Sequence, residues 1–280
     1  MQTRIITDSS CDMPVSLRKQ IASVPLTLTF ADTEYIDEVT LSKQKFYEML
    51  IESDVLPKTS QASPDAFSKV FSSVQREGGQ AVVIKVGSSF SGTNQSANIA
   101  AKDYKDIYIV DSESVSIGCG ILAEYALGLA KSGMEAWEIK AILDSVKKRL
   151  VIIALLDTLE YLKKGGRISK TAAFAGGLLG IKPVISMVQG EIRILGKARG
   201  SKHGNNLLVQ EIEKTGGVDF NMPVLLGYTG ISDALLMKYI RDSESLFSEK
   251  GEAPDTTIIG SIIGTHAGPG AIAAAFFKKV

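Results

Sequence analysis

The chain has 280 residues, of which 45% are hydrophobic, with 31 basic and 31 acidic side chains. This length and composition predict a large core and exclude a disordered chain, and the balanced charge gives no general attraction to nucleic acid. Two cysteines, Cys11 and Cys119, are too few for a disulfide framework, and no His/Cys spacing predicts a metal site.

The sequence predicts neither a targeting segment nor a membrane segment. The N-terminal residues MQTRIITDSS lead directly into a strand-like run, without the basic-then-apolar pattern of a signal peptide. The longest apolar stretch, Ala172 to Val188, is rich in glycine and is interrupted by Lys182-Pro183, which argues against a bilayer-spanning helix. We therefore expect a cytoplasmic protein without an integral membrane segment.

The first half of the chain alternates short apolar runs with helical periods. Strands are predicted at Arg4–Thr7, Val24–Phe30, Ala81–Val86 and Ile107–Val110. Helices are predicted from Pro64 through Val74, from near Gly92 through Ala101, from near Gly118 through Leu129, and over Met134–Leu150. Ser63 is the expected N-cap of the first of these helices. Strands separated by helices imply right-handed crossovers and a mostly parallel sheet.

The second half predicts a more mixed arrangement. Helices are predicted at Leu155–Lys164, Thr171–Leu179, Asp233–Leu246 and Ala271–Phe277. Strands are predicted at Val184–Val188, Glu191–Leu195, Val224–Tyr228 and Thr257–Ile263. Gln189-Gly190 has the character of a hairpin turn, which indicates antiparallel pairing of the strands beside it. Gly165-Gly166 marks the end of the first helix.

These patterns predict an α/β fold of two domains. A mostly parallel α/β/α domain is expected over residues 1–153, and a mixed-sheet α/β domain over residues 154–280. The boundary follows the change in pattern, since no Pro- or Ser-rich linker marks it.

Five predicted strand ends carry small hydroxyl residues at the point where a helix should begin. They are Asp8-Ser9-Ser10, Thr59-Ser60-Gln61, Ser88–Thr93, Asp111-Ser112 and Thr265-His266. In an open α/β fold such ends converge on one crevice, where ligands bind. None of them carries an evident nucleophile–base pair, so the sequence predicts a site that holds an anionic group and does not attack it.

Ser91-Gly92-Thr93 follows a predicted buried strand and opens a helix. Its backbone N–H groups, the helix dipole and two hydroxyls can receive a carboxylate or a phosphate. The same residues can equally serve as the cap of their own helix, and from the sequence alone both interpretations stay open. The glycine spacing of a nucleophile elbow is absent around Ser91.

Thr59-Ser60-Gln61 lies just before the helix that begins at Pro64. Taken alone, this segment is best explained as a loop of turn-forming residues. The presence of a second hydroxyl cluster at a helix entrance in the same predicted domain strengthens the binding interpretation.

His266 is one of only two histidines and is followed closely by a Gly-Pro-Gly sequence. A solitary histidine is often only structural, but flanking glycines permit a ligand to approach closely, which favours a functional role. A histidine that holds a carboxylate needs an orienting partner, and Arg167 is one candidate.

Nucleotide-binding motifs are not supported. Gly118-Cys119-Gly120 and Gly268-Pro269-Gly270 resemble a dinucleotide fingerprint, but neither follows the first strand with an acidic residue about twenty positions on. Close helix packing therefore explains these glycines better than NAD does, and no P-loop is present. Basic clusters at Lys163-Lys164 and Lys197–His203 are typical of solvated faces, although the second can also attract an anionic partner.

In their order along the chain, these motifs resemble the DegV family of bacterial fatty-acid-binding proteins, which includes the carrier subunits of fatty acid kinase. The resemblance covers essentially the whole chain. The segments that carry it are Ile5–Ser10, Thr59-Ser60-Gln61, Phe90–Thr93, Leu159–Ile168, Ile181-Lys182-Pro183 and His266 with its Gly-Pro-Gly context.

The resemblance implies a two-domain α/β fold with a long-chain fatty acid, such as palmitate, buried between the domains. It implies that Thr59, Ser91 and His266 hold the carboxylate. The residues implied to support them are Arg167, Ser60, Gly92 and Thr93. Arg199 matches a family arginine implicated in engaging a kinase subunit, which phosphorylates the bound acid to an acyl phosphate. Such a carrier supplies no catalytic residue and needs no cofactor.

Two positions depart from the family's usual pattern. Ala62 stands where a proline often follows Thr-Ser-Gln, and the proline comes at Pro64 instead. Phe90 stands where a leucine is usual, which reshapes the expected pocket wall and leaves the preferred chain length open. Ser91 itself is unchanged.

Two other functions are retained as alternatives. The main one is an acyl hydrolase or transferase that uses Ser91 with His266, for which the sequence offers no clear third member or oxyanion motif. The other is a domain that binds a small phosphate or a dihydroxyacetone-type compound, suggested by analogy of fold alone.

Overall fold

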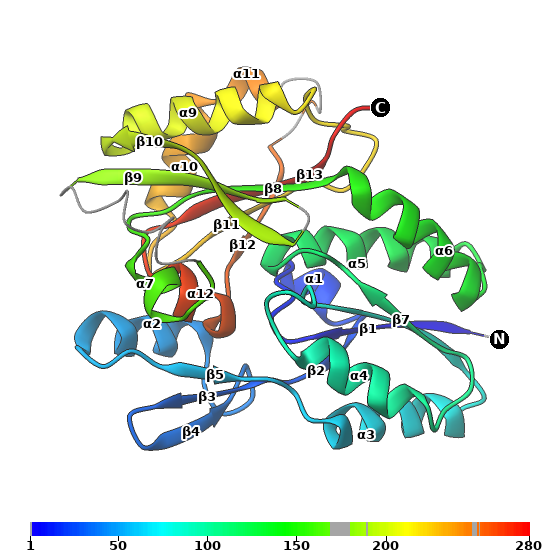
Figure 1. Ribbon diagram of the computed structural model, residues 1–280. Coiled ribbons are helices and arrows are strands. Elements are labelled where there is room, and N and C mark those ends of the chain that lie inside the picture. Colours follow the sequence, from blue (N-terminus) through cyan, green and yellow to red (C-terminus); the bar gives the residue numbers. More distant parts are fainter. Residues whose placement is uncertain (1, 169–179, 189, 248–250, 252) are drawn as a thin grey trace.

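The computed structural model describes every residue of the chain except 1, 169–179, 189, 248–250 and 252. Within the described residues the strands form three sheets, of four, six and three strands. Figure 1 shows the six-stranded sheet in the upper part of the molecule and the four-stranded sheet at the lower right, with helices packed against both. The α/β class predicted from the sequence is therefore confirmed.

The four-stranded sheet is parallel throughout. Its strands, in spatial order, are β2 (Ala22–Val24), β1 (Thr3–Asp8), β6 (Gln80–Lys85) and β7 (Ile107–Asp111). Its helices are α3 (Pro64–Arg76), α4 (Thr93–Ala101), α5 (Ser116–Lys131) and α6 (Ala136–Val146). Ile5 and Val82 pack with α5 and α6, whereas Ile6 and Val83 pack with α3 and α4, because successive side chains of a strand point to opposite faces. The predicted parallel α/β/α arrangement is confirmed.

The six-stranded sheet is mixed. Its strands, in spatial order, are β10 (Glu191–Arg199), β9 (Ile181–Val188), β8 (Leu150–Leu155), β13 (Ile272–Phe277), β11 (Leu225–Tyr228) and β12 (Asp255–Ile258). Neighbours are antiparallel except β11 and β12, and the β9–β10 pair is the predicted hairpin. One face carries α9 (Gly200–Lys214), α10 (Ala234–Asp242) and α11 (Glu244–Phe247). The other face carries α5, α7 (Glu160–Lys164) and α12 (Ser261–Ala267).

The third sheet is a small antiparallel one. Its strands are β4 (Thr33–Ile36), β3 (Thr27–Phe30) and β5 (Lys58–Ser60), and α2 (Lys43–Glu52) lies in the chain between β4 and β5. Both β3 and β5 contact α12, so this sheet connects the N-terminal part of the chain to the C-terminal part. Two short elements, α1 (Val15–Arg18) and a 3-10 turn at Lys147–Arg149, complete the described structure.

Helix α5 lies between the two larger sheets. It contacts β1 and β6 on one side and β8, β11 and β13 on the other, and its residues Ser116–Ala123 are all buried. A helix that is apolar on all sides is expected in such a position. A Cβ atom on Gly120 would lie 2.1 Å from the carbonyl oxygen of Asp12. Close packing therefore accounts for this glycine, as predicted, and a dinucleotide fingerprint is not needed.

Three predicted elements in the first 164 residues have wrong bounds. The single strand predicted over Val24–Phe30 is divided between β2 and β3, which belong to different sheets, and Pro25, with no N–H to donate to a ladder, lies between them. The helix predicted over Met134–Leu150 ends at Val146 and the helix predicted over Leu155–Lys164 begins at Glu160, because Leu150–Leu155, with three β-branched residues, forms β8 between them. Residue 153 lies within β8, and the division into two domains stays a prediction.

The largest error concerns the end of the chain. The predicted strand Thr257–Ile263 stops at Ile258 and is followed by α12, and the predicted helix Ala271–Phe277 is replaced by strand β13. Alanine favours helix by propensity, but this segment is buried between β8 and β11, and that tertiary context decides its structure. Asp233–Leu246 forms two helices separated at Ser243. The predicted helix Thr171–Leu179 lies outside the described residues.

Candidate functional site: a mainly apolar cavity

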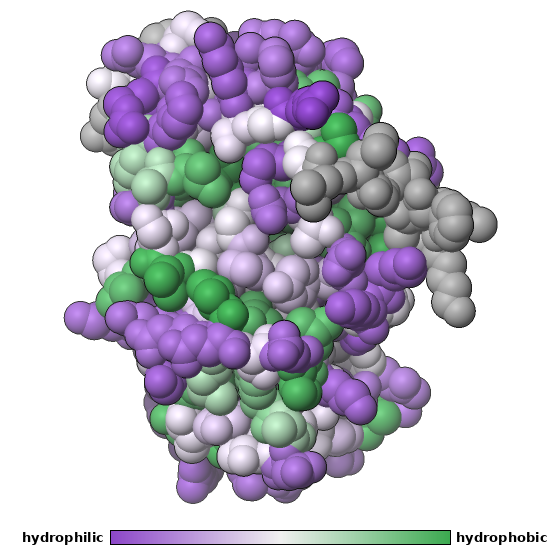
Figure 2. Space-filling view, turned by 90° about the vertical axis from the view of Figure 1, so that its left-hand side faces the viewer, coloured by the Kyte–Doolittle hydropathy of each residue, from purple (hydrophilic) through white to green (hydrophobic). Residues whose placement is uncertain are grey.

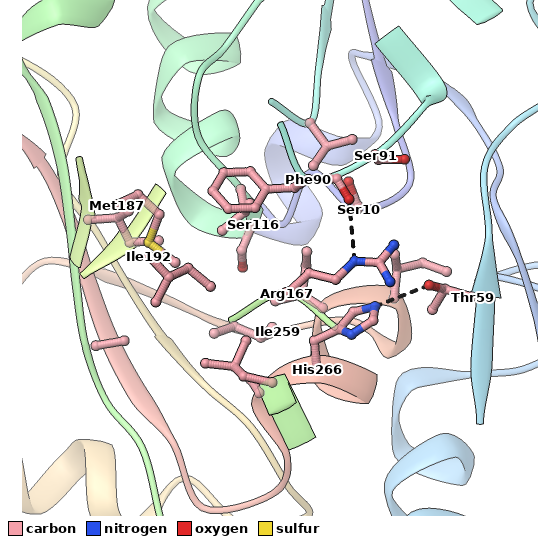
Figure 3. Close-up of a pocket in the computed structure, with 18 of the residues that line it drawn as sticks. Ser10, Thr59, Phe90, Ser91, Ser116, Arg167, Met187, Ile192, Ile259 and His266 are labelled. Atoms are coloured by element: carbon pink, nitrogen blue, oxygen red, sulfur yellow. Dashed lines mark hydrogen bonds between the residues drawn. The ribbon is translucent and has the colours of Figure 1, made fainter. Parts of the chain in front are cut away.

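A cavity of about 240 Å³ lies between the six-stranded sheet, helix α12 and the loops that follow β1 and β6. The residues singled out from the sequence that line it are Ser10, Thr59, Ser60, Gln61, Phe90, Ser91, Gly92, Arg167 and His266. Figure 3 shows the polar side chains on one side of this cavity, with Met187 and Ile192 on the opposite side. The fold therefore assembles residues from distant parts of the sequence around one space with a polar end and an apolar end.

Thr59 and His266 are in direct contact at the polar end. Thr59 Oγ1 is hydrogen-bonded to His266 Nε2 at 3.1 Å. Thr59 lies on β5, at the edge of the small sheet, and His266 lies in the last turn of α12. The prediction that Thr265-His266 follows a strand directly is wrong, but the prediction that His266 belongs to the same site as Thr59 agrees with this contact.

The buried carboxylate of Asp12 holds the beginning of α12 in place. Asp12 Oδ1 accepts hydrogen bonds from the N–H of Gly260 at 2.7 Å and from Lys43 Nζ at 2.9 Å. Asp12 Oδ2 accepts a hydrogen bond from Ser116 Oγ at 2.7 Å. Through these contacts the loop after β1 is joined to α2, α5 and α12, so the elements around the cavity are fixed relative to one another.

His266 is held as a neutral imidazole. Burial lowers its pKa from 6.5 to about 4, and the positive charge of Arg167 acts in the same direction. Among the described residues, Nδ1 of His266 has no hydrogen-bond partner. A Cβ atom on Gly165 would lie 2.2 Å from this nitrogen, so the glycine is what allows the end of α7 to pack against the ring.

Ser91 both supports helix α4 and lines the cavity. Its Oγ accepts a hydrogen bond from the N–H of Thr93 at 3.2 Å and lies 2.9 Å from Thr93 Oγ1. Thr93 is buried behind it. Gly92 is the N-cap of α4, and the side chain of Gln61 occupies the space that a Cβ atom would need, with Oε1 1.9 Å away. No side chain caps α4, so the interpretation that Ser91 or Thr93 is the cap of its own helix is wrong. Ser91 and Gly92 both line the cavity, and their role in holding an anion stays a prediction.

Arg167 does not hydrogen-bond His266, contrary to the expectation that it orients the ring. Its Nη1 donates to the carbonyl oxygen of Gly165 at 2.7 Å, and its Nε lies 3.4 Å from the carbonyl oxygen of Phe90. Both contacts are with backbone carbonyls, so Arg167 acts on His266 through its charge. Figure 3 shows its guanidinium group close to the ring of His266.

The other hydroxyl-bearing strand ends hold loops. Asp8 accepts hydrogen bonds from the N–H of Ser10 at 2.9 Å and from the N–H of Val86 at 2.8 Å. Asp111 Oδ1 accepts a hydrogen bond from the N–H of Ser88 at 3.1 Å. These carboxylates therefore hold the loops after β1 and β6 in place. Ser10 also lines the cavity, in agreement with the expectation that these strand ends meet at one crevice.

Apart from Phe90, the apolar part of the cavity is made by residues that no sequence motif indicated. Its floor is formed by alternate residues of β8, β9 and β13, and by Ala271 just before β13: Ile152, Ala154, Ile185, Met187, Ala271 and Ala273. Other walls come from Leu26, Val86, Phe90 and Val115, and from Ile259, Ile262 and Ile263 next to or on α12. Alternation with a period of two is a detectable signal, but it was hidden where β13 was predicted as a helix.

Arg199 lies outside this cavity. It is exposed at the end of β10, immediately before α9. Among the described residues, no group of three or more His, Cys, Asp or Glu side chains is placed to hold a metal ion. Of the helices in the described ranges, none combines the length and the apolar character needed to cross a bilayer.

The fold is α/β, and its cavity has a polar side and a larger apolar part. The chain belongs to the DegV family, whose family model, described as an uncharacterised protein of that family, matches residues 2–279. It is 34% identical over 283 residues to a DegV domain-containing protein from Caldanaerobacter subterraneus subsp. tengcongensis, with 98% of each chain covered. The family resemblance found in the sequence is therefore confirmed.

Solved structures share this fold along the whole chain. A DegV lipid-binding protein from Thermotoga maritima is 26% identical, with a TM-score of 0.86 over 99% of this chain and 98% of the other. A stearic acid-binding protein from Eubacterium ventriosum is 28% identical, also with a TM-score of 0.86 over 99% of this chain and 98% of the other. The predicted DegV-like fold is confirmed by these likenesses.

Proposed function

We propose that this protein binds one long-chain fatty acid, such as palmitate, with its carboxylate at Thr59, Ser91 and His266. The observation that carries the proposal is the division of the cavity into a side with hydroxyls and a neutral imidazole and a larger aliphatic part. A ligand with one polar head and a long apolar tail matches this division. The Thermotoga and Eubacterium proteins, described as binding a lipid and stearic acid, support the same ligand class.

The head-group assignment rests on the donors that surround the polar end. A buried carboxylate is costly unless it is hydrogen-bonded. The hydroxyls of Thr59 and Ser91, and the N–H groups at the start of α4 beside Gly92, provide donors together with the positive end of the helix dipole. Arg167 adds a positive charge near His266 and makes no hydrogen bond to the imidazole ring. A carboxylate held by such neutral donors stays available to a partner enzyme.

The acyl chain supplies most of the binding free energy. About fourteen methylenes contribute on the order of 11 kcal/mol at roughly 0.8 kcal/mol each. Lost translational freedom and the ordering of the chain offset part of this gain, which leaves an affinity in the micromolar range or tighter. The aliphatic floor and walls of the cavity are suited to this burial.

We propose that the protein is a carrier and supplies no catalytic residue. Nε2 of His266 meets Thr59, and the hydrogen bonds of Ser91 go to Thr93, so the serine and the histidine are not paired as a nucleophile and its base. Within the described residues, no carboxylate orients the ring at Nδ1. A pKa of about 4 also makes His266 a weak base at neutral pH. These features favour a carrier over the hydrolase or transferase.

The ligand and the carrier role can be tested on delipidated protein. Titration with palmitate and with hexadecanol compares two ligands that share the chain and differ in the carboxylate. We expect palmitate to bind more tightly and an added palmitoyl ester to stay intact. Equal affinity for the two ligands would remove the head-group assignment, and ester turnover that is lost in Ser91→Ala would establish the hydrolase instead.

We further propose that a kinase partner phosphorylates the bound acid to an acyl phosphate and contacts Arg199. Lys202 and His203, in the first turn of α9, are exposed together with Arg199, which gives this corner a basic surface. Figure 2 shows that the upper end of this face, which includes α9, is largely hydrophilic. We expect Arg199→Ala to weaken binding of the cognate kinase and to leave palmitate affinity unchanged. Arg193→Ala, another exposed arginine of β10, is the control, and an equal effect of both would contradict the assignment.

A further inference from the structure

The floor of the cavity is built from three successive rows of the six-stranded sheet. Ile152 and Ala154 of β8 and Ile185 and Met187 of β9 are alternate residues, so they point to the same face. Ala271, just before β13, and Ala273, its second residue, also alternate. Because the strands run side by side in register, these residues form successive rows across the sheet.

The middle row contains two alanines side by side. Ala154 is directly opposite Ala273, and on its other side Ala154 is opposite Ile185. Side chains directly opposite in antiparallel strands have Cβ atoms only about 5 Å apart, so a larger residue at either alanine would fill the space above both. The Ala154–Ala273 pair therefore forms a shallow trough in the floor of the cavity.

The next row carries larger side chains on β8, β9 and β10. Met187 is directly opposite Ile192 of β10, and Ile152 is opposite Ala275, two residues beyond Ala273. This row lies about 7 Å further along the strands, at about 3.4 Å per residue. Figure 3 shows Met187 and Ile192 on the side of the cavity away from Thr59 and His266. The trough therefore leads from the polar end to a wall of larger side chains.

Space exists on the other side of this wall. Phe90, Arg167 and Ile192 line both the cavity and a second pocket, whose other residues include Ser89, Gly190 and Glu191. Of these three, Ile192 lies at the apolar end of the cavity. We therefore expect a smaller side chain at Ile192 to open the apolar end towards this neighbouring hollow.

We infer that the Ala154–Ala273 pair and the Met187–Ile192 pair select the length of the acyl chain, the first by leaving room and the second by closing the cavity. This inference rests on the proposed fatty-acid function. The end wall combines a flexible side chain, Met187, with a stiff β-branched one, Ile192. Each methylene that gains or loses a buried position changes affinity by about fourfold.

Substitutions at the two pairs have opposite expected effects. Met187→Ala and Ile192→Ala lengthen the cavity, so the preferred acid becomes longer. Each added methylene that is buried raises the affinity for the longer acid, relative to the shorter one, by about fourfold. Ala273→Val fills the trough, so long acids lose affinity relative to shorter ones. Valine is chosen because a β-branched residue fits a strand.

Ala274→Val is the matched control. Ala274 is the next residue of the same strand, is equally buried, and faces the core on the side of α9 and α10. It receives the same change in volume without touching the cavity. We expect Ala274→Val to lose stability and to prefer the same acyl chain length as the wild type.

The experiment measures the affinity of each delipidated variant for straight-chain saturated acids from lauric to arachidic acid. Opposite shifts in the preferred length for Ile192→Ala and Ala273→Val support the inference. If the wild-type protein binds an acid and all variants keep the wild-type order of preference, the inference is overturned and the proposed function is not. The inference is also overturned if Ala274→Val shifts the preferred chain length as Ala273→Val does. Wild-type protein that binds none of the acids would overturn the proposed function. If Ala273→Val does not fold, Met187→Ala and Ile192→Ala decide the result.

Discussion

The hydroxyl of Thr59 lies 3.1 Å from Nε2 of His266, although 207 residues separate them in the sequence. This contact joins β5 of the small sheet to α12, which Asp12 fixes against the loop after β1. The polar end of the cavity is therefore a meeting point of the N-terminal and C-terminal parts of the chain. It follows that changes in either part alter the same site.

Removing the hydroxyl of Thr59 or Ser91 is expected to weaken palmitate binding and leave the fold intact. A hydrogen bond to a charged group contributes about 1.5–3 kcal/mol, so Thr59→Ala and Ser91→Ala should each lower affinity by roughly tenfold to a hundredfold. Titration of delipidated protein measures this change, and circular dichroism checks the fold.

Ser63→Ala is the control for these two variants. Ser63 caps α3 by accepting a hydrogen bond from the N–H of Ala66 at 3.2 Å, and it does not line the cavity. Its loss should cost about 1 kcal/mol of stability without changing affinity. Unchanged palmitate affinity in both Thr59→Ala and Ser91→Ala would refute the head-group assignment.

Addition of a methyl group at Gly165 is expected to disturb the site from behind. Gly165 has a φ of −75°, which alanine adopts without strain, but the new Cβ atom would lie 2.2 Å from Nδ1 of His266. The ring must then move away from its contact with Thr59. We expect Gly165→Ala to lower palmitate affinity by about tenfold, the loss of one charge-assisted hydrogen bond.

Gly128→Ala provides the comparison for Gly165→Ala. Gly128 lies within α5, and a Cβ atom there would meet nothing within 4 Å. Alanine should raise stability by about 1 kcal/mol and leave affinity unchanged. Equal affinities of the two glycine variants would show that packing at Gly165 does not position the histidine.

The lowered pKa of His266 predicts a specific dependence of stability on pH. The folded chain has a pKa of about 4 and the unfolded chain about 6.5, so between these values only the unfolded chain binds the proton. Stability from this group is complete above pH 6.5 and is lost as the pH falls towards 4, by at most about 3 kcal/mol. Denaturant unfolding of delipidated wild type and His266→Gln should show the wild type losing relative stability over this window. A stability difference between the wild type and His266→Gln that stays constant over this pH range would contradict the lowered pKa of His266.

The buried carboxyl group of Asp37 predicts a pH dependence of stability with the opposite sign. Burial raises the pKa of its carboxyl from 3.8 to about 6, against hydrogen bonds from Ser261 and Ser9 that lower it. The folded chain holds the proton more tightly here, so stability from this group is present below pH 3.8 and is lost as the pH rises through 6. Asp37→Asn should therefore gain stability relative to the wild type over this range, by about 3 kcal/mol at most, in the same unfolding measurement. If Asp37→Asn instead loses stability relative to the wild type as the pH rises, the raised pKa of Asp37 is refuted.

The sequence was most informative where local chemistry decides the structure. The capped start at Ser63 and Pro64, the parallel strands around Ile5 and Val82, and the hairpin at Gly190 all follow from side chains close in the chain. The small-residue run Ala273–Ala275 could not be assigned in this way, because its position between β8 and β11 overrides the helical propensity of alanine.

The polar residues of the site could be predicted from the sequence, whereas most of the apolar ones could not. Thr59, Ser91 and His266 were found through short motifs, and the structure brings all of them to one cavity. The floor residues Ala154 and Met187 carry no chemical signature, and they become part of a site only through the register of three strands. Gln61, beside Gly92, lay within a recognised motif but was identified as a lining residue only from the structure.

The most direct test of the central claim is mass spectrometry of a denaturing extract of the purified protein. We predict a long-chain fatty acid, at roughly one molecule per chain, because the cavity described above has a single polar end. The double variant Thr59→Ala and Ser91→Ala should carry much less. A folded wild-type protein that releases no fatty acid, or that releases a small phosphate or dihydroxyacetone-type compound instead, would contradict the account.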